Sequence, residues 1–320
     1  MENAVALPTA SWSYYGVSNT APTWKILAAI GIAIFLWSGN NIASKIVISE
    51  WPVMASTCVR FGIGSFILLG VLGRFSSQRH PQPIDAKLRR ELWLGPGLSF
   101  TVYLMSFIWA LNYTTASHVA LYFAASPAFA MLWDRLSGQA IPWTRTLLAA
   151  SLTFTGVLWL FLPSLSGTES TVLGDSLAFL GSLLWVHYSH QSRQFQGRLP
   201  AAQLNGEIFW RTTLLTSPFF LYDIATQTIE WSTPVVIAFV YTAIGPSILA
   251  FLAWSYALRH WPTSKVMLFV NLIPLMTALW AYAILGETVG RDFWIAVSFV
   301  AAGVYVSVGR MPLLGKRSKA

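Results

Sequence analysis

Two apolar stretches of this chain, 147 residues apart, repeat each other. Aligning Ala110–Trp133 with Ala257–Trp280 gives eight identical pairs among twenty-four, and one of them matches Pro127 with Pro274. A composition this biased gives about two or three identities by chance, so the stretches are interpreted as copies of one unit. A proline removes a backbone hydrogen bond that hydrocarbon cannot replace. The matched prolines therefore predict corresponding interrupted helices, with a binding site near the interruptions.

The apolar residues lie in runs long enough to cross a membrane. The 320-residue chain is 55% hydrophobic and only 10% charged, whereas soluble domains carry about 25% charged residues. Its runs of about 18–22 apolar residues match a helix that crosses about 30 Å of hydrocarbon. The net charge of +8 comes mainly from Lys and Arg in short connections between the runs, which argues against nucleic-acid binding. The sequence therefore predicts an all-α integral membrane protein.

We predict ten transmembrane helices, five in each half. Since a span needs about 20 residues, their approximate ranges are 25–44, 53–73, 92–111, 116–134, 144–162, 172–190, 204–222, 234–254, 264–284 and 292–310. The sixth range is the least apolar, because it holds Asp175, His187 and His190. An odd number of spans in each half turns the second copy over, so the two five-helix repeats are expected to be inverted.

The positive charges predict the orientation of the chain. With the N-terminus in the cytoplasm, fifteen Lys and Arg fall on the cytoplasmic side and only Lys45 and Arg291 on the other. Because cytoplasmic loops are the basic ones, both termini are expected on the cytoplasmic side of a bacterial-type inner membrane. The N-terminal segment lacks the continuous apolar core of a signal peptide. The two halves and the two cytoplasmic tails that flank them are expected at 24–162, 172–310, 1–23 and 311–320.

Several motifs in the spans and loops are recognisable. They are Phe35-Leu36-Trp37-Ser38-Gly39-Asn40-Asn41, Trp51-Pro52, Arg60-Phe61, Ala110-Leu111-Asn112-Tyr113, Gly138-Gln139, Tyr256-Ala257-Leu258 and Leu285-Gly286-Glu287. Together they resemble the EamA-type domain of the drug/metabolite transporter superfamily, in two tandem copies. The resemblance implies ten helices, an inverted repeat and export of small metabolites, amino acids or toxic compounds. Gln139 departs from the family pattern, which usually has Glu in this loop, as the second copy does at Glu287.

Aromatic and polar side chains within the spans are candidates for a substrate site. Trp37 aligns with Trp185, and these indoles form either the walls of a central cavity or ordinary packing and interface contacts. Asn40, which then aligns with Tyr188, either joins two helices or binds a substrate. The whole candidate binding set is Trp37, Asn40, Tyr103, Phe107, Tyr122, Trp185, Tyr188, Trp254, Lys265 and Asn271.

The other members of this set also have two interpretations. Tyr103 and Phe107 share a helix face, and they and Trp254 either stack on a ligand or pack toward lipid. Lys265 either attracts a substrate carboxylate or extends to the interface. Asn271 precedes Pro274 by three residues and can bond either the carbonyl freed by that proline or a ligand.

Charged groups inside the spans are candidates for coupling or gating. Glu207 is the only carboxylate placed well inside a span, which makes it a candidate proton-coupling site. It precedes Arg211 by four residues, so a structural ion pair is the alternative. Arg60 is the counterpart of Arg211 in the first half. His118 either titrates near neutral pH or is structural. The candidate hinges are Pro127 and Pro274.

No cofactor or metal site is predicted. Cys58 is the only cysteine, which excludes an intramolecular disulfide and a Cys-rich metal site. His187 and His190 lack further ligands nearby in the sequence. A phosphate-binding G-x-x-x-x-G-K-[ST] loop is absent, which argues against ATP as the energy source.

These features predict a secondary transporter, an exporter of small metabolites such as amino acids or of amphipathic or cationic compounds, that works by alternating access between its halves. Its expected partners are a small-molecule substrate and membrane lipids. Proton coupling and facilitated diffusion both remain open. The alternatives are a lipid flippase, a non-transporting membrane sensor and, with the least support, a membrane-embedded enzyme.

Overall fold

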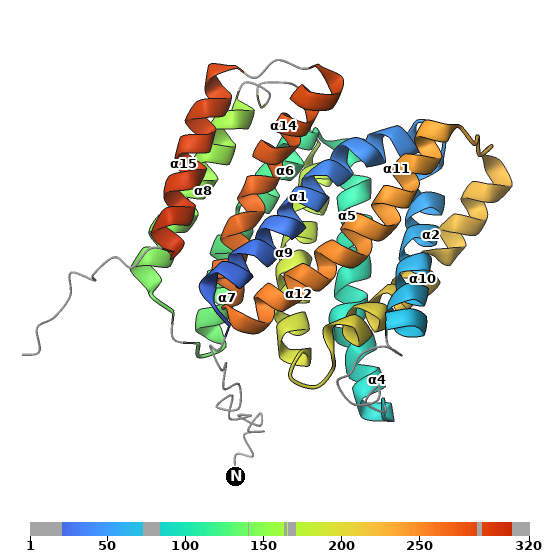
Figure 1. The fold of residues 1–320 in the computed structure, drawn as a ribbon, viewed down its shortest axis with the longest axis horizontal. Helices are drawn as coiled ribbons and strands as arrows, with labels where there is room; N and C mark the ends of the chain where they lie inside the picture. The colour runs from blue at the N-terminus through green and yellow to red at the C-terminus, as the bar shows by residue number, and fades with distance from the viewer. Residues whose placement is uncertain are drawn as a thin grey trace, which may run out of the picture.

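Long helices joined by short connections run up and down through the molecule (Figure 1). The computed structural model describes residues 21–72, 84–139, 141–162, 165, 171–286 and 290–308, and every regular element in these ranges is helical. The elements of the first half are α1 (Thr23–Ile48), α2 (Val53–Ser65), η1 (Phe66–Leu72), α4 (Ala86–Leu92), η2 (Trp93–Gly97), α5 (Leu98–Tyr113), α6 (Ala116–Ala124), α7 (Ser126–Leu136) and α8 (Trp143–Phe161). Those of the second half are α9 (Val172–Phe195), α10 (Ala201–Thr226), α11 (Thr233–Ile244), η4 (Gly245–Leu249), α12 (Ala250–His260), α13 (Thr263–Met267), η5 (Leu268–Asn271), α14 (Leu272–Leu285) and α15 (Arg291–Val308).

Seven of the described helices are long and apolar enough to cross a membrane: Thr23–Ile48, Val53–Leu72, Ala86–Tyr113, Trp143–Phe161, Thr233–His260, Thr263–Ile284 and Arg291–Val308. The predicted spans at 116–134, 172–190 and 204–222 are not among them. The first is divided by a turn at Ala125, and α9 and α10 bury polar residues such as His190 and Arg211 against other helices. An all-helical bundle with several membrane-crossing helices is therefore confirmed, whereas the number of ten is not.

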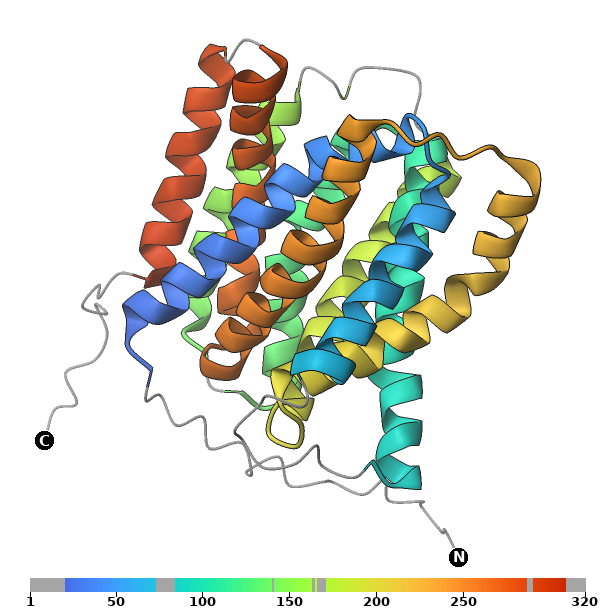
Figure 2. The same cartoon turned by 45° about the vertical axis from the view of Figure 1, so that its right-hand side comes forward.

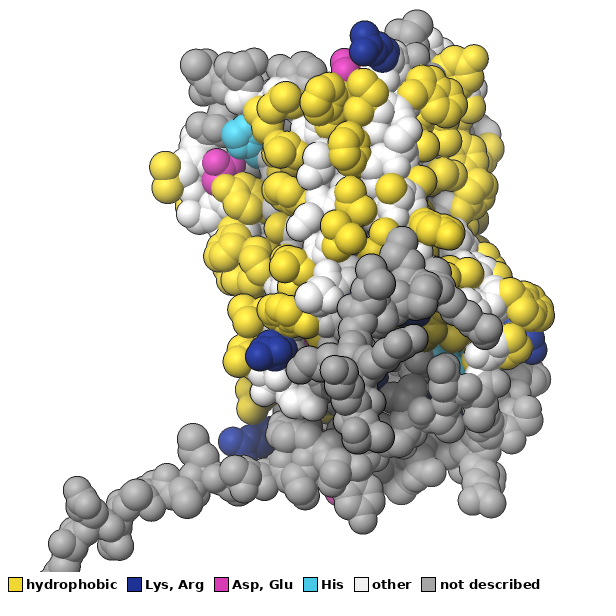
Figure 3. All heavy atoms as spheres, turned by 90° about the vertical axis from the view of Figure 1, so that its left-hand side faces the viewer, with side chains coloured by type: hydrophobic (Ala, Val, Ile, Leu, Met, Phe, Trp, Pro, Cys, Tyr) yellow, Lys and Arg dark blue, Asp and Glu magenta, His cyan; other side chains and the backbone are white. Residues whose placement is uncertain are grey.

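The surface of the bundle suits a hydrocarbon environment. Figure 3 shows a band of hydrophobic side chains on the face at the left of Figure 1, with charged side chains toward its upper and lower parts. Large apolar side chains such as Trp294 and Tyr305 of α15 are 60% and 68% exposed. Such a contiguous apolar surface is costly in water and favourable in lipid.

Positive charge is unequally divided between the two ends of the bundle. Helix α1 begins and α15 ends at the lower end in Figure 1, where α4 also lies. The helices that start or finish at this end bring Lys25, Lys87, Arg89, Arg90, Arg135, Arg145, Arg193, Arg198 and Arg259 there. Among the described residues, the opposite end has Lys45 and Arg291. The predicted tails, 1–23 and 311–320, fall almost wholly outside the described residues.

The matched prolines follow breaks in their helices. Pro127 lies in the first turn of α7, directly after the turn at Ala125. In the second half, the 3₁₀ turn η5 separates α13 from α14, and Pro274 lies in the first turn of α14. The two breaks contact each other, because Asn271 Nδ2 donates a hydrogen bond to the carbonyl of Ala124 at 3.2 Å. These residues are 147 positions apart, so the contact joins equivalent points of the two copies.

Glycines allow α8 and α15 to approach closely, and the two helices lie side by side in Figures 1 and 2. A methyl group on Gly156 would lie 2.8 Å from the carbonyl oxygen of Ala296, and one on Gly303 would lie 2.8 Å from that of Ala149. Gly156 and Gly303 are 147 residues apart, and so are Ala149 and Ala296. The interface therefore contains the same contact twice, with the two copies exchanged. Small residues at such a crossing favour close helix packing in membranes.

Candidate functional site

Three indoles from three helices meet in the core of the bundle. The ring of Trp37 on α1 lies 5.6 Å from that of Trp185 on α9 and 5.2 Å from that of Trp254 on α12. Trp185 and Trp254 are stacked, with centroids 5.9 Å apart, and both are almost fully buried. The sequence alignment of Trp37 with Trp185 thus corresponds to a direct contact between the halves. These rings pack edge and face against one another, as aromatic pairs prefer.

Further aromatic residues extend this cluster in one direction. Tyr103 on α5 lies 5.1 Å from Trp185, and Tyr188 lies 5.4 Å from the same ring. Phe107 lies at the edge, 6.4 Å from Tyr103. Tyr122 makes its ring contact with Phe179 of α9, at 6.2 Å, and packs against the same buried residues as Phe107.

The polar atoms of the cluster are only partly satisfied. Trp37 Nε1 donates to the carbonyl of Pro246 at 3.2 Å, inside the π-helical turn η4. The hydroxyl of Tyr188 donates to Asn205 Oδ1 at 3.4 Å. Trp254 Nε1 is buried without a hydrogen-bond partner among the described residues. A buried donor without a partner costs free energy, so this indole N–H is a candidate contact for a bound substrate.

A positive charge lies beside the aromatic cluster. Arg60 Nη1 on α2 donates to Asn40 Oδ1 on α1 at 3.2 Å. Its Nε is buried without a partner, and within the described part of the chain no carboxylate forms an ion pair with it. Tyr103 is close enough to the guanidinium to interact with it electrostatically. Asn40 therefore joins α1 to α2, which is one of its two interpretations from sequence. The Arg60–Asn40 pair leaves Nε of Arg60 as a donor for an anionic group.

Glu207 and Arg211 form the ion pair that their spacing predicts. Arg211 Nη1 donates to Glu207 Oε2 at 2.6 Å, and Trp210 Nε1 donates to the same oxygen at 2.7 Å. The guanidinium lies between the rings of Trp93 and Trp210, 5.2 and 4.6 Å from their centroids. Its side chain is 1% exposed. A carboxylate held by two donors beside a buried cation favours the structural interpretation of Glu207.

The remaining candidates lie near the ends of the helices. His118 Nδ1 is 3.2 Å from Asp175 Oδ1 of α9, an oxygen that also accepts from Thr114. Lys265 Nζ lies 3.8 Å above the ring centre of Trp261, which is a cation–π contact. Neither residue joins the aromatic cluster. Asn271 bonds the carbonyl of Ala124 in the opposite half rather than its own, and its Oδ1 is buried without a partner among the residues that the structure describes.

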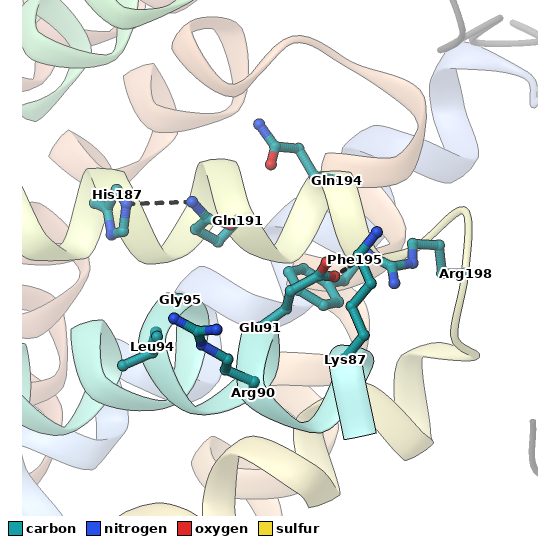
Figure 4. A pocket seen from close by; sticks show the side chains of 10 residues that line it. All are labelled: Lys87, Arg90, Glu91, Leu94, Gly95, His187, Gln191, Gln194, Phe195 and Arg198. Carbon is teal, nitrogen blue, oxygen red and sulfur yellow. Dashed lines mark hydrogen bonds and ion pairs between the residues drawn. The ribbon is translucent and has the colours of Figure 1, made fainter. Parts of the chain in front are cut away.

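A pocket of about 600 Å³ opens beside α4 and α9 at the lower end of the bundle (Figure 4). Its lining residues are Lys87, Arg90, Glu91, Leu94, Gly95, His187, Gln191, Gln194, Phe195 and Arg198. Glu91, the one carboxylate of this lining, is paired with Arg198. On the inner side, His187 bonds Gln191 at 3.2 Å and Ser99 at 2.6 Å. The pocket lining has more cationic than anionic side chains, so it would attract anionic groups. Sequence reasoning missed this pocket because its two sides are about 100 residues apart.

Asp134 was also missed as a buried carboxylate. It comes at the end of a predicted span, next to Arg135, which is typical of an exposed membrane interface. The structure buries its side chain completely, between α7, α9 and α13. Its neighbours are supplied by residues 56 to 130 positions away in the sequence, so no local pattern could have indicated the burial.

Both halves of the chain match one protein family. Residues 23–162 and 172–309 each match the EamA-like transporter family. An uncharacterized transporter of Archaeoglobus fulgidus is 26% identical, over 88% of this chain and 96% of that protein. Probable amino-acid metabolite efflux pumps of Salmonella typhimurium and Escherichia coli are 21% and 20% identical, each over 87% of this chain and 92% of theirs. A solved structure with 21% identity has the same fold, with a TM-score of 0.75 over 90% of this chain and 99% of that one.

Proposed function

Because the chain belongs to the EamA-like transporter family, we propose that it is a secondary transporter that exports small metabolites, such as amino acids or amphipathic or cationic compounds. The chain is a multi-pass membrane transporter, and its relatives are named transporters or efflux pumps rather than enzymes. The two relatives named probable amino-acid metabolite efflux pumps support both the direction and the substrate class.

The observation that carries the proposed mechanism is the contact between equivalent points of the two copies. Asn271 meets Ala124 where both helices are broken, and the glycine contacts of α8 and α15 occur twice with the copies exchanged. Both support two inverted five-helix halves, at 24–162 and 172–310. In such a fold, access alternates when the halves exchange conformations around a central site. Pro127 and Pro274 are the proposed flex points.

The lower end of Figure 1 is the proposed cytoplasmic side of a bacterial inner membrane. The described Lys and Arg gather there, which agrees with the rule that cytoplasmic ends are the basic ones. Both tails would then be cytoplasmic. The basic pocket beside α4 and α9 would open toward the cytoplasm, where a substrate to be exported first meets the protein.

The aromatic cluster and the adjacent Arg60–Asn40 pair form the proposed substrate site. Rings from both halves, Trp37 and Trp185 among them, offer faces for the apolar or cationic part of a substrate. The Arg60 guanidinium, which has no ion pair in the described part of the chain, offers charge-assisted hydrogen bonds to a carboxylate. A small zwitterion with an apolar side chain has both groups.

The transport proposal can be tested by counterflow in proteoliposomes, with labelled amino acids, nucleosides, polyamines and organic cations. We expect saturable exchange of at least one compound. Trp37→Ala and Trp185→Ala should each weaken apparent affinity about tenfold, because one aromatic contact contributes up to about 1.5 kcal/mol. Trp294→Ala is the matched control, since that indole is 60% exposed on the outer surface. Exchange that survives both core substitutions would reject the site, and no exchange with any compound would reject the transport proposal.

Arg60 provides a test of the substrate class. Arg60→Gln keeps a donor for Asn40 but removes the positive charge. For substrates with a carboxylate we expect a loss in affinity of about tenfold or more, because charge-assisted hydrogen bonds contribute about 1.5–3 kcal/mol. Organic cations without a carboxylate should be transported at least as well as before. Equal losses for both classes, measured in the same exchange assay, would show that Arg60 does not select carboxylates.

A further inference from the structure

Asp134 links α7 of the first half to α13 of the second. Its Oδ2 accepts a hydrogen bond from the backbone N–H of Ser264 at 3.0 Å. Ser264 lies in the first turn of α13, where backbone N–H groups have no intrahelical acceptor. The carboxylate therefore caps a helix of the opposite half, at the proposed cytoplasmic end.

The other oxygen of Asp134 faces a histidine. Asp134 Oδ1 lies 3.5 Å from His190 Nε2 on α9, and the two side chains are 0% and 2% exposed. Neither of these two atoms has a hydrogen-bond partner among the described residues. The His190 ring stacks on Trp133, with centroids 5.5 Å apart and planes at 28°, which fixes its orientation.

The remaining ring nitrogen of His190 determines where its proton lies. The ring makes a hydrogen bond to the backbone of Ala130 on α7. Since Nε2 has no hydrogen-bond partner within the described ranges, Nδ1 makes this bond, and a backbone carbonyl can only accept. Nδ1 therefore carries the proton of the neutral ring. Two acceptors, a carboxylate oxygen and a ring nitrogen, are then left facing each other.

One proton converts this contact into a hydrogen bond. Whether it sits on Nε2 or on Oδ1, it supplies the donor that both buried atoms lack, and the cost of two unsatisfied acceptors disappears. Without that proton, the lone pairs of Oδ1 and Nε2 repel each other, and no water screens this repulsion in the buried site. The contact between α7 and α9 is therefore stable with one proton and unstable with none.

We propose that Asp134 and His190 form a one-proton site that holds the cytoplasmic end of the transporter closed when the proton is bound. The inference rests on the proposed transport function only for its effect on flux. Proton binding closes the Nε2···Oδ1 gap while Oδ2 keeps its cap on α13, so α7, α9 and α13 are held together. Proton release lets the helices separate, and the proton leaves to water.

The surrounding charges limit the site to a single proton. On α9, Arg193 interacts with Asp134 and, together with His187, with His190. Arg193 also donates to Gln139 at 2.5 Å. On α13, Lys265 is next to Ser264 in sequence and interacts with Arg145 of α8. On α7, Arg135 points to Trp143, 4.9 Å from its ring. This positive surrounding disfavours a second proton on the pair.

Exchange at equal pH on both sides tests the proposal. In the natural protein, exchange should rise with pH as the proton leaves. Asp134→Asn should be about tenfold slower at high pH and independent of pH, because its amide can accept from Ser264 and donate to His190 permanently. Exchange by His190→Ala should also be independent of pH but fast, since no hydrogen bond to Asp134 then holds α7 and α9 together. Two flat profiles at opposite levels cannot come from general damage.

The matched control is Asp223→Asn. Asp223 caps α2 through the backbone N–H of Ala55 at 2.9 Å and has no histidine within ion-pair distance among the described residues. It should therefore keep the natural pH profile. If exchange by the natural protein does not change with pH, or if Asp134→Asn keeps its pH dependence, the proton site is rejected.

A second measurement does not depend on transport. The five histidines can be labelled with ¹⁵N in detergent-solubilised protein, and His190 assigned by its loss in His190→Gln. We expect one titration step for its ring nitrogens that is absent in Asp134→Asn. His190 signals that titrate identically in both proteins would overturn the proposal. If no substrate exchanges, the transport function fails, while these spectra still decide the proton site.

Discussion

Replacing Glu207 by alanine is expected to lower the free energy of unfolding by about 3–5 kcal/mol, the usual cost of leaving one member of a buried ion pair alone. Arg211 is 1% exposed, and its Nε and Nη2 already lack partners among the described residues. The substitution removes the carboxylate that compensates its charge, and Trp210 loses an acceptor as well. The midpoint of thermal unfolding in detergent and the yield of folded protein should both fall clearly.

Two further variants define the cause of this effect. Glu207→Gln keeps an acceptor for both donors, so its effect should be smaller than that of alanine. Glu91→Ala breaks the exposed pair with Arg198, and should cost no more than about 1 kcal/mol. Glu207→Ala protein that remains as stable as the natural protein but loses uphill, pH-dependent transport would contradict the structural role and restore Glu207 as a coupling site.

Alanine at Gly156 or Gly303 is expected to destabilise the protein by about 1–3 kcal/mol, the usual cost of overpacking a tight contact. Each new methyl group would lie 2.8 Å from a carbonyl oxygen of the facing helix, and still closer to a side-chain methyl group of that helix, which belongs to Val300 or Thr153. Because backbone cannot move aside as a flexible side chain can, α8 and α15 must separate. Thermal unfolding of the purified variants measures the loss.

The duplicated geometry adds a quantitative expectation. Since the two glycines make equivalent contacts, their alanine variants should lose similar stability. Gly31→Ala on α1 is the control, because no atom of the described residues lies within 4 Å of the added methyl group. There alanine should be neutral or stabilising by up to about 1 kcal/mol, as the better helix former. A loss at Gly31 equal to that at Gly156 would show that helix–helix contact is not the cause.

The repeat and the membrane-crossing helices could be predicted because their signals are local or periodic. Pro127 and Pro274 are recognisable in sequence, and the structure has a helix break before each. The pairing of Glu207 with Arg211 follows from a spacing of four residues on one helix. The spans predicted over α9 and α10 are not confirmed, since both helices bury polar residues that lower their hydropathy.

Apart from the pairing of Trp37 with Trp185, the contacts between distant helices could not be predicted from the sequence. The sequence places Tyr122 in the candidate binding set but does not indicate its ring contact with Phe179. Asp134 lies at the end of the span predicted at 116–134, and the sequence does not indicate that its side chain contacts α13 and a histidine of α9. In both cases the deciding neighbours come from other helices. The partner of such a side chain is determined by tertiary packing, and no local sequence pattern indicates it.

Under the proposed alternating-access mechanism, the duplicated contact between α8 and α15 has a consequence for the balance between inward-open and outward-open states. A contact that becomes itself when the two halves trade places has the same energy in both states, so it cannot favour either. The cap at Asp134 is different, because its counterpart 147 residues on is Ala281, which has no carboxylate. Substitutions at the glycines should therefore change the fraction of protein that is folded. Substitutions at Asp134 should change whether the resting protein is open to the inside or to the outside.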